Sequence, residues 1–205
     1  MTVLFPIAPQ SDEYFAGFLV RATAENHYHH PYEILMEAQV NHHRPGTFGL
    51  SRRDQLAPLA AYMQVDVVAL EQMFMPAGRR PGTFKFHGSV ISKQHLETTI
   101  RRVSPRGLRT SPYSRAIWQL RPFSFDPVTK EQLLCSCPEC GRAFGFERTL
   151  GVAYCDWCET PDQWGFPGPA VDLRDYPQPL VEVNDAEALD FVVALVDKYL
   201  RDRAP

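Results

Sequence analysis

The 205-residue sequence lacks several features that would place it in a common class of protein. No apolar run approaches the roughly 20 residues of a membrane-spanning helix, so no membrane association is expected. The first residues lack the basic and apolar regions of a secretory signal, which predicts a cytoplasmic protein. The chain also lacks a Gly-x-x-x-x-Gly-Lys-Ser/Thr phosphate loop and a His-Glu-x-x-His helix. We therefore predict that it is not an enzyme; a nuclease built from dispersed carboxylates is the alternative.

Cysteine is scarce, but four of the five cysteines form two matched Cys-x-x-Cys pairs. Each pair can direct two sulfurs at one ion, so two facing pairs make a closed tetrahedral site for zinc. We predict one structural Zn2+, with a turn at Gly141 and a short hairpin between residues 144 and 154. Two disulfides are the alternative, which a reducing compartment disfavours, and Cys135 is expected to be an incidental thiol. The predicted ligands are Cys137, Cys140, Cys155 and Cys158.

Charge is unevenly distributed along a chain whose formal net charge is −3. Residues 76–121 contain ten Lys/Arg and one acid, Glu97. Within them, polar and aromatic side chains alternate at residues 83–87, which is typical of a strand. Concentrated Lys and Arg attract phosphates through counterion release. We predict that this region binds a nucleic-acid backbone without base specificity; a solvated loop is the alternative. The candidate contacts are Arg79, Arg80, Lys85, Arg101, Arg102, Arg106 and Arg109.

Apolar periodicity and capping residues predict an N-terminal helical domain over residues 1–78. Helices are expected over 12–26 and 31–40, and two more are expected to open at Ser51 and Asp66. The last two resemble a helix-turn-helix. Because the second of this pair is acidic, we expect the pair to serve as a packing or protein-docking scaffold rather than to contact DNA bases.

The remaining sequence is predicted to form a basic linker over 79–102, a zinc-ribbon domain over 103–165 and a C-terminal extension over 166–205. Within the extension, apolar spacing predicts a helix over 185–202. This helix is expected to pack on the protein's own core, with docking of a partner as the alternative. The predicted fold class is therefore mainly α with a small β zinc ribbon.

Two segments and the cysteine pairs occur in an order that is similar to a known family. The first segment is Leu4-Phe5-Pro6 followed by Asp12-Glu13-Tyr14-Phe15-Ala16-Gly17-Phe18-Leu19-Val20-Arg21-Ala22 and Asn26. The second is Tyr113-Ser114-Arg115-Ala116-Ile117-Trp118-Gln119-Leu120. In this order they resemble the TniQ family of Tn7-like transposons, over residues 3–160.

The resemblance implies an accessory protein in DNA transposition. Such an adaptor links target-site recognition to the AAA+ regulator TnsC, with DNA or guide RNA among its partners. In a CRISPR-associated transposon the recognition is made by a Cascade or Cas12k effector. A stand-alone zinc-ribbon DNA-binding regulator is the alternative function, and association of two copies as a homodimer stays open.

The chain departs from the family at one point. The family carries a further zinc site before the ribbon, and the corresponding positions here are Ser104, Gly107, Asp126 and Thr129. Of these residue types, only aspartate is a usual zinc ligand. The sequence therefore predicts one zinc ion rather than two, with aromatic packing in place of the lost site.

Overall fold

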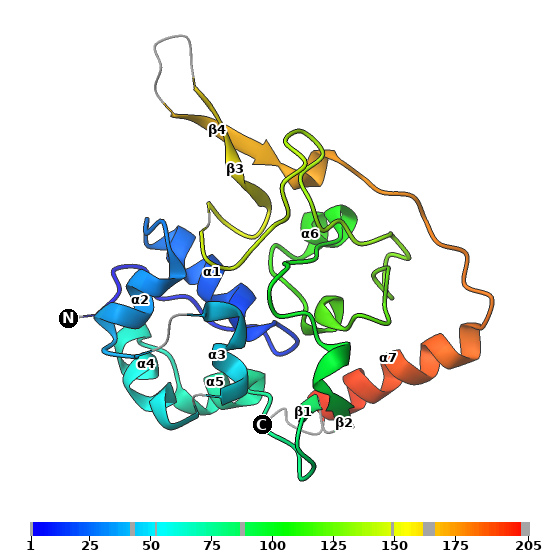
Figure 1. The fold of residues 1–205 in the computed structure, drawn as a ribbon, viewed down its shortest axis with the longest axis horizontal. Coiled ribbons are helices and arrows are strands. Elements are labelled where there is room, and N and C mark those ends of the chain that lie inside the picture. Colours follow the sequence, from blue (N-terminus) through cyan, green and yellow to red (C-terminus); the bar gives the residue numbers. More distant parts are fainter. Residues whose placement is uncertain are drawn as a thin grey trace.

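The computed structural model describes residues 2–41, 44–51, 53–86, 89–148, 150–161 and 167–201, which combine helices with small antiparallel sheets (Figure 1). The N-terminal half contains α1 (Phe15–Glu25), α2 (Pro31–Glu37), α3 (Pro45–Ser51), the 3₁₀ turn η1 (Arg53–Gln55), α4 (Leu56–Met63) and α5 (Val67–Met73). The rest contains β1 (Thr83–Phe86), β2 (Ser89–Ser92), η2 (Lys93–His95), α6 (Pro105–Thr110), η3 (Ala116–Gln119), β3 (Tyr154–Pro161), β4 (Pro167–Asp172), η4 (Leu173–Asp175) and α7 (Ala186–Arg201).

Helix α1 lies between two hydrophobic cores. Phe15, Phe18 and Leu19 belong to a core that α1 forms with α2, α3, α4 and α5. Ala16 and Val20, on the same helix, belong to a second core that extends from β1 to η4. The predicted N-terminal domain is therefore packed against the rest of the protein through α1, which is buried on two sides, and through Leu50 of α3.

The start of α1 differs from the prediction because the residues before it pair with a distant segment. Glu13 forms an isolated antiparallel bridge with Arg115, and Tyr14 after it is also extended, so the helix begins only at Phe15. The close approach continues along the helix. A Cβ added to Gly17 would lie 2.5 Å from the Cβ of Ser114, so glycine is needed there.

Of the later N-terminal helices, α2, α4 and α5 agree with the prediction in type and differ at their ends, whereas α3 was not predicted. Helix α5 begins after Asp66, whose side chain accepts a 2.9 Å hydrogen bond from the amide of Val68, as the capping signal predicted. The helix predicted to open at Ser51 begins instead at Leu56, which places Pro58 in a first turn where no amide hydrogen is required. Between the two helices Gln64 is left-handed, with φ of 55°. Their assignment as a helix-turn-helix stays a prediction.

Among the described residues, one antiparallel pair of strands lies in the predicted basic linker, and a second pair extends from the predicted ribbon into the predicted C-terminal extension. Strands β1 and β2 pair from Thr83↔Ser92 to Phe86↔Ser89, which confirms the predicted strand. The hairpin predicted between residues 144 and 154 is wrong, because β3 pairs with β4, beyond the cysteines. Prolines at the start of β4 argue against a strand in sequence reasoning, but an edge strand tolerates them. The predicted boundary at residue 165 thus falls between two paired strands.

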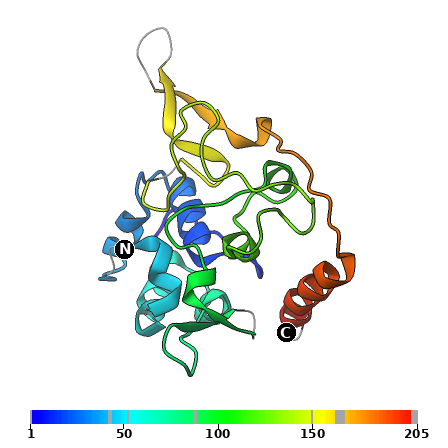
Figure 2. The ribbon, with the colours of Figure 1, turned by 45° about the vertical axis from the view of Figure 1, so that its right-hand side comes forward.

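Helix α7 confirms the predicted C-terminal helix. It begins at Ala186, and the Asp185 side chain accepts a 2.8 Å hydrogen bond from the amide of Ala188. An extended segment leads to it from η4 and runs along one edge of the molecule, away from β3 (Figure 2). On this helix Leu189 is buried, whereas Phe191 is 64% exposed. In the described part of the chain no helix has the length and apolar character needed to span a bilayer.

Candidate metal centre

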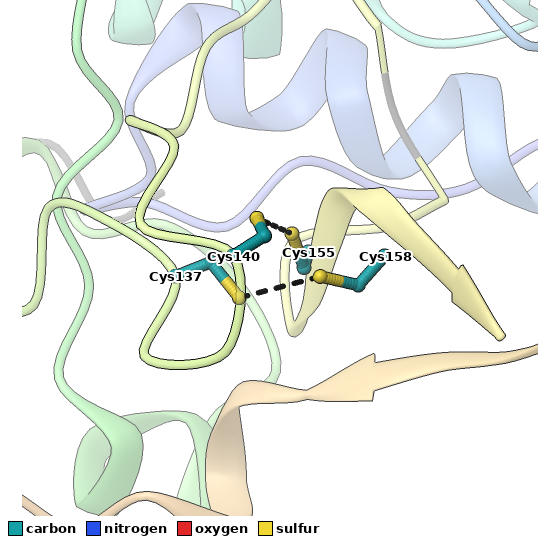
Figure 3. Close-up of side chains that lie close together, drawn as sticks. All are labelled: Cys137, Cys140, Cys155 and Cys158. Atoms are coloured by element: carbon teal, nitrogen blue, oxygen red, sulfur yellow. Dashed lines mark hydrogen bonds between the residues drawn. The ribbon is translucent and has the colours of Figure 1, made fainter.

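The two Cys-x-x-Cys pairs converge on one point (Figure 3). The Sγ atoms of Cys137 and Cys158 are 3.7 Å apart, and those of Cys140 and Cys155 are 3.8 Å apart. All four sulfurs lie within 4.8 Å of one another, and all are free thiols rather than members of two disulfides. Because metal–sulfur bonds of about 2.3 Å place tetrahedral ligands about 3.8 Å apart, the cluster could hold a metal ion.

Backbone hydrogen bonds shape each half of the cluster. In the first pair, the amide of Gly141 donates to the carbonyl of Cys137 at 2.8 Å, with Gly141 at φ of 70°, as the predicted turn requires. The second pair lies on β3, where the amide of Trp157 donates to Sγ of Cys155 at 3.4 Å. Burial raises the pKa of the Cys155 and Cys158 thiols, so a metal ion must displace protons from this cluster when it binds.

Arg101 supports this centre from inside the core, which overturns its predicted role as a phosphate contact. Its side chain is fully buried and forms a 2.8 Å ion pair with Asp156, one of the two residues between the second pair of cysteines. The same guanidinium donates to three backbone carbonyls, those of Gly151, Val152 and Tyr154. A buried arginine cannot reach a phosphate, and here it fixes the start of β3.

Asp156 extends this support to the stretch that follows the first pair of cysteines. Its second carboxylate oxygen accepts a 3.2 Å hydrogen bond from the amide of Gly145. The Arg101 guanidinium also lies 5.5 Å from the ring centroid of Phe144. Burial raises the pKa of the Asp156 carboxyl, although Arg101 and the Gly145 amide favour its charged form. The Arg101–Asp156 ion pair thus connects the segment that follows the first pair of cysteines to the strand that carries the second pair.

The other predicted phosphate contacts fall into two groups. Arg102 is half-buried and donates to the carbonyls of Leu120 and Phe123, and Arg106 and Arg109 lie on α6. On α6, Arg106 faces Glu131 at 3.4 Å and Arg109 donates to the carbonyl of Arg174. A second group of exposed side chains lies on β1 and in the turn before it, and forms no ion pair with any described residue; β1 and α6 lie apart (Figures 1 and 2). This group consists of Arg79, Arg80 and Lys85.

The four positions that correspond to the family's further zinc site also lie together, and hydrogen bonds join them. Ser104 caps α6 by accepting from the amide of Gly107 at 2.9 Å, and its hydroxyl lies 3.2 Å from that of Thr129. The Thr129 hydroxyl donates in turn to Asp126 at 2.8 Å. Asp126 also accepts from the indole of buried Trp118 at 2.9 Å. The sequence predicted that packing alone replaces the lost site, whereas the structure adds a polar network.

Glu131 is the central acceptor beside this network, and sequence reasoning missed it. Its side chain is fully buried, and one oxygen accepts from the Ser104 hydroxyl at 2.5 Å and from the Arg106 amide at 2.7 Å. The other oxygen accepts from the amide of Gln178 at 2.8 Å. A single carboxylate thereby joins α6 to the extended segment before α7. No local pattern in the sequence distinguishes this acid from its exposed neighbours.

Replacing Glu131 with glutamine is expected to lower the free energy of unfolding by about 2–3 kcal/mol, because an amide NH2 group then faces buried donors. Chemical denaturation of the metal-loaded protein measures this difference. Glu182→Gln makes the same chemical change at an exposed position and is the matched control. Equal stability of the two variants would contradict the role of Glu131.

The fold and the site define a protein of mixed α and β structure with a closed four-cysteine cluster. The two segments that carry the TniQ resemblance contact each other directly: the Tyr113 hydroxyl donates to Asp12 at 2.6 Å, and the amide of Ala116 donates to the carbonyl of Asp12 at 2.8 Å. No protein-family model matches the chain, and no curated protein matches it. Membership of that family therefore stays a prediction.

Proposed function

We propose that this protein is a zinc-stabilised adaptor in DNA transposition. It links recognition of a target site to the AAA+ regulator TnsC and holds a nucleic-acid backbone while doing so. Its proposed partners are TnsC, DNA or guide RNA, and an RNA-guided effector of the Cascade or Cas12k kind. An adaptor with these partners acts in the cytoplasm.

The observation that supports this proposal most strongly is the union of the two TniQ-like segments in one structural unit. Glu13 forms a β-bridge with Arg115. Beside it, the Tyr113 hydroxyl donates a hydrogen bond to Asp12, which lies 101 positions away in the sequence. Such a contact gives a physical reason for both motifs to occur in one chain. It argues that they serve a shared scaffold, as the resemblance implies.

The chemistry of the cysteine cluster supports a structural Zn2+. Thiolates select soft or borderline ions over magnesium and calcium, and four sulfurs complete a tetrahedral shell. A shell that is complete leaves no position for a substrate or an activated water molecule. The centre is thus suited to holding the fold together, which agrees with an adaptor rather than an enzyme.

Exposed cations around β1 supply the proposed backbone contact. Arg79 and Arg80 lie in the turn before β1, and Lys85 lies on the strand. All three are exposed and form no ion pair with the described part of the chain, so their charges are available to phosphates. Binding through these cations is not expected to be sequence-specific, because contacts to the backbone carry no sequence information directly.

Association with the ATPase tests the adaptor role. The tagged protein is expected to retain TnsC on a resin in the presence of ATP, and to do so after nuclease treatment, which removes contacts bridged by DNA. The matched sample uses the tag alone. Failure to retain TnsC, together with tight binding to one DNA sequence, would instead favour the stand-alone regulator.

A further inference from the structure

A groove of about 840 Å3 lies where the N-terminal helices meet the region of the cysteine cluster. One wall comes from residues around the start of α3, and another comes from residues 98–100 together with η2. The third wall is formed by residues 143–148 and by Trp157 of β3. Ligand sites in proteins commonly enclose roughly 300–1,000 Å3, so the groove is large enough to hold a nucleotide unit.

Positive charge dominates the side chains around this groove. Its walls carry the cations of Arg44, Lys93 and Arg148. Two acids also line it, but Asp156 is 1% exposed and paired with Arg101 inside the core. Glu147 is the remaining carboxylate among the described lining residues. This balance favours an anionic ligand.

Trp157 offers a stacking surface beside these charges. Its side chain is 44% exposed, although it lies between two cysteines of the metal cluster. The guanidinium carbons of Arg142 and Arg148 lie 5.0 Å and 5.5 Å from its ring centroid. Proteins bind unpaired bases by stacking them on aromatic rings and on arginine planes, with nearby cations on the phosphates.

We propose that this groove binds a single-stranded segment of nucleic acid, with one base stacked on Trp157 and the adjoining phosphates held by Lys93, Arg44 and Arg148. The inference rests on the proposed role in nucleic-acid-dependent targeting, and it names a site separate from the exposed cations around β1. A duplex does not suit it, because the bases of a duplex are already stacked and paired. The groove would recognise the strand by an unpaired base and the phosphates next to it.

The contacts that now cover Trp157 do not prevent such binding. An exposed cation–π contact contributes about 2- to 5-fold to an equilibrium constant, whereas a base stacked on an aromatic ring contributes about 5- to 150-fold. An arriving base can therefore displace a guanidinium from the ring. The backbone that carries the ring is held in place, because the amide of Trp157 donates to Sγ of Cys155.

Fluorescence anisotropy with labelled oligonucleotides tests the proposal. Trp157→Ala is expected to weaken binding of a single strand by about 5- to 150-fold, whereas Trp157→Phe retains most of the affinity. Phe191→Ala removes an exposed aromatic side chain on α7, across the molecule, and is the matched control that should bind normally. Metal content is measured for each variant, so that loss of the cluster is not mistaken for loss of stacking. Unchanged affinity in metal-loaded Trp157→Ala would overturn the proposal.

A second measurement does not depend on the folding of any variant. Wild-type protein is irradiated with a single strand that carries 5-iodouracil, and the crosslinked peptide is identified by mass spectrometry. The expected crosslink lies at Trp157, whereas crosslinks confined to the segment of Arg79, Arg80 and Lys85 would overturn the proposal. Mononucleotides and duplexes of the same sequence are tested in parallel. Equal affinity for either of them would also overturn it.

Failure of this inference differs from failure of the adaptor role. If Arg79→Glu with Arg80→Glu weakens single strands and duplexes alike while Trp157→Ala has no effect, the groove proposal is wrong and the backbone contact stands. If binding depends on Trp157 but TnsC is not retained, the groove is supported and the transposition role is wrong. The two conclusions can therefore be reached independently.

Discussion

Replacing Cys140 with serine is expected to release the metal ion and to unfold the region around the cysteine cluster. Zinc binding contributes about 10–16 kcal/mol in zinc-finger peptides, whereas the total stability of a domain is about 5–15 kcal/mol. A loss of only about 5 kcal/mol lowers the melting temperature by about 10–20 °C in a chain of this size. Elemental analysis is expected to find one zinc ion per wild-type chain and close to none in the variant.

The chain offers a matched control for this prediction. Cys135 is an exposed thiol outside the cluster, so Cys135→Ser makes the same chemical change and should preserve both metal content and melting temperature. If Cys140→Ser melts with the wild type, a structural role for the metal is refuted. Two zinc ions per wild-type chain would refute the account of Ser104 and its neighbours as a hydrogen-bonded replacement for the further site.

The consequences of metal loss should be uneven along the chain. The cluster residues Cys137 and Cys155 belong to the second core, together with Phe144 and Phe146. The first core is formed by the N-terminal helices and contains no cysteine. Because α1 contributes to both cores, we expect the N-terminal helices to loosen after metal loss while retaining part of their helical structure. Hydrogen exchange of the variant separates these two regions.

Local chemical signals in the sequence predicted much of the secondary structure and the metal ligands. Asp66 and Asp185 predicted helix starts because a short acidic side chain before an apolar run can accept from a free amide. The Cys-x-x-Cys spacing predicted the cluster for a similar reason, since each pair lies within four consecutive residues and is shaped by local hydrogen bonds. Such signals act over a few residues and do not depend on the rest of the fold.

The features that the sequence did not predict depend on contacts between distant segments. Arg101 sits in a run of cations that looks solvated, and only the position of β3 reveals a buried carboxylate beside it. Glu131 likewise depends on α6 and on the segment near Gln178. Charge density along a chain counts residues without regard to burial. It therefore assigned Arg101 to the same surface as Arg79, Arg80 and Lys85, whose side chains are exposed.

Replacing Arg101 with methionine is expected to be the second most damaging change, at about 3–5 kcal/mol in the free energy of unfolding. Methionine fills a similar volume, but it leaves the carboxylate of Asp156 buried without its partner. The carbonyls that accept from the guanidinium also lose their donors. Chemical denaturation of the metal-loaded variant measures this loss. Arg79→Met, at an exposed position without an ion pair, should change stability by less than about 0.5 kcal/mol.

Combining Arg101→Met with Asp156→Asn separates the cost of a lone buried charge from the value of the pair. If the uncompensated carboxylate causes most of the damage, the double variant will be more stable than Arg101→Met alone. A double variant that loses the sum of the two single effects would show that the pair contributes nothing beyond its members.

Nucleic-acid affinity provides a further check, because a buried arginine contacts no phosphate. Arg101→Met protein that remains folded should bind an oligonucleotide as the wild type does, and a fall in affinity with the salt dependence of a lost phosphate contact would restore the surface role that the sequence suggested.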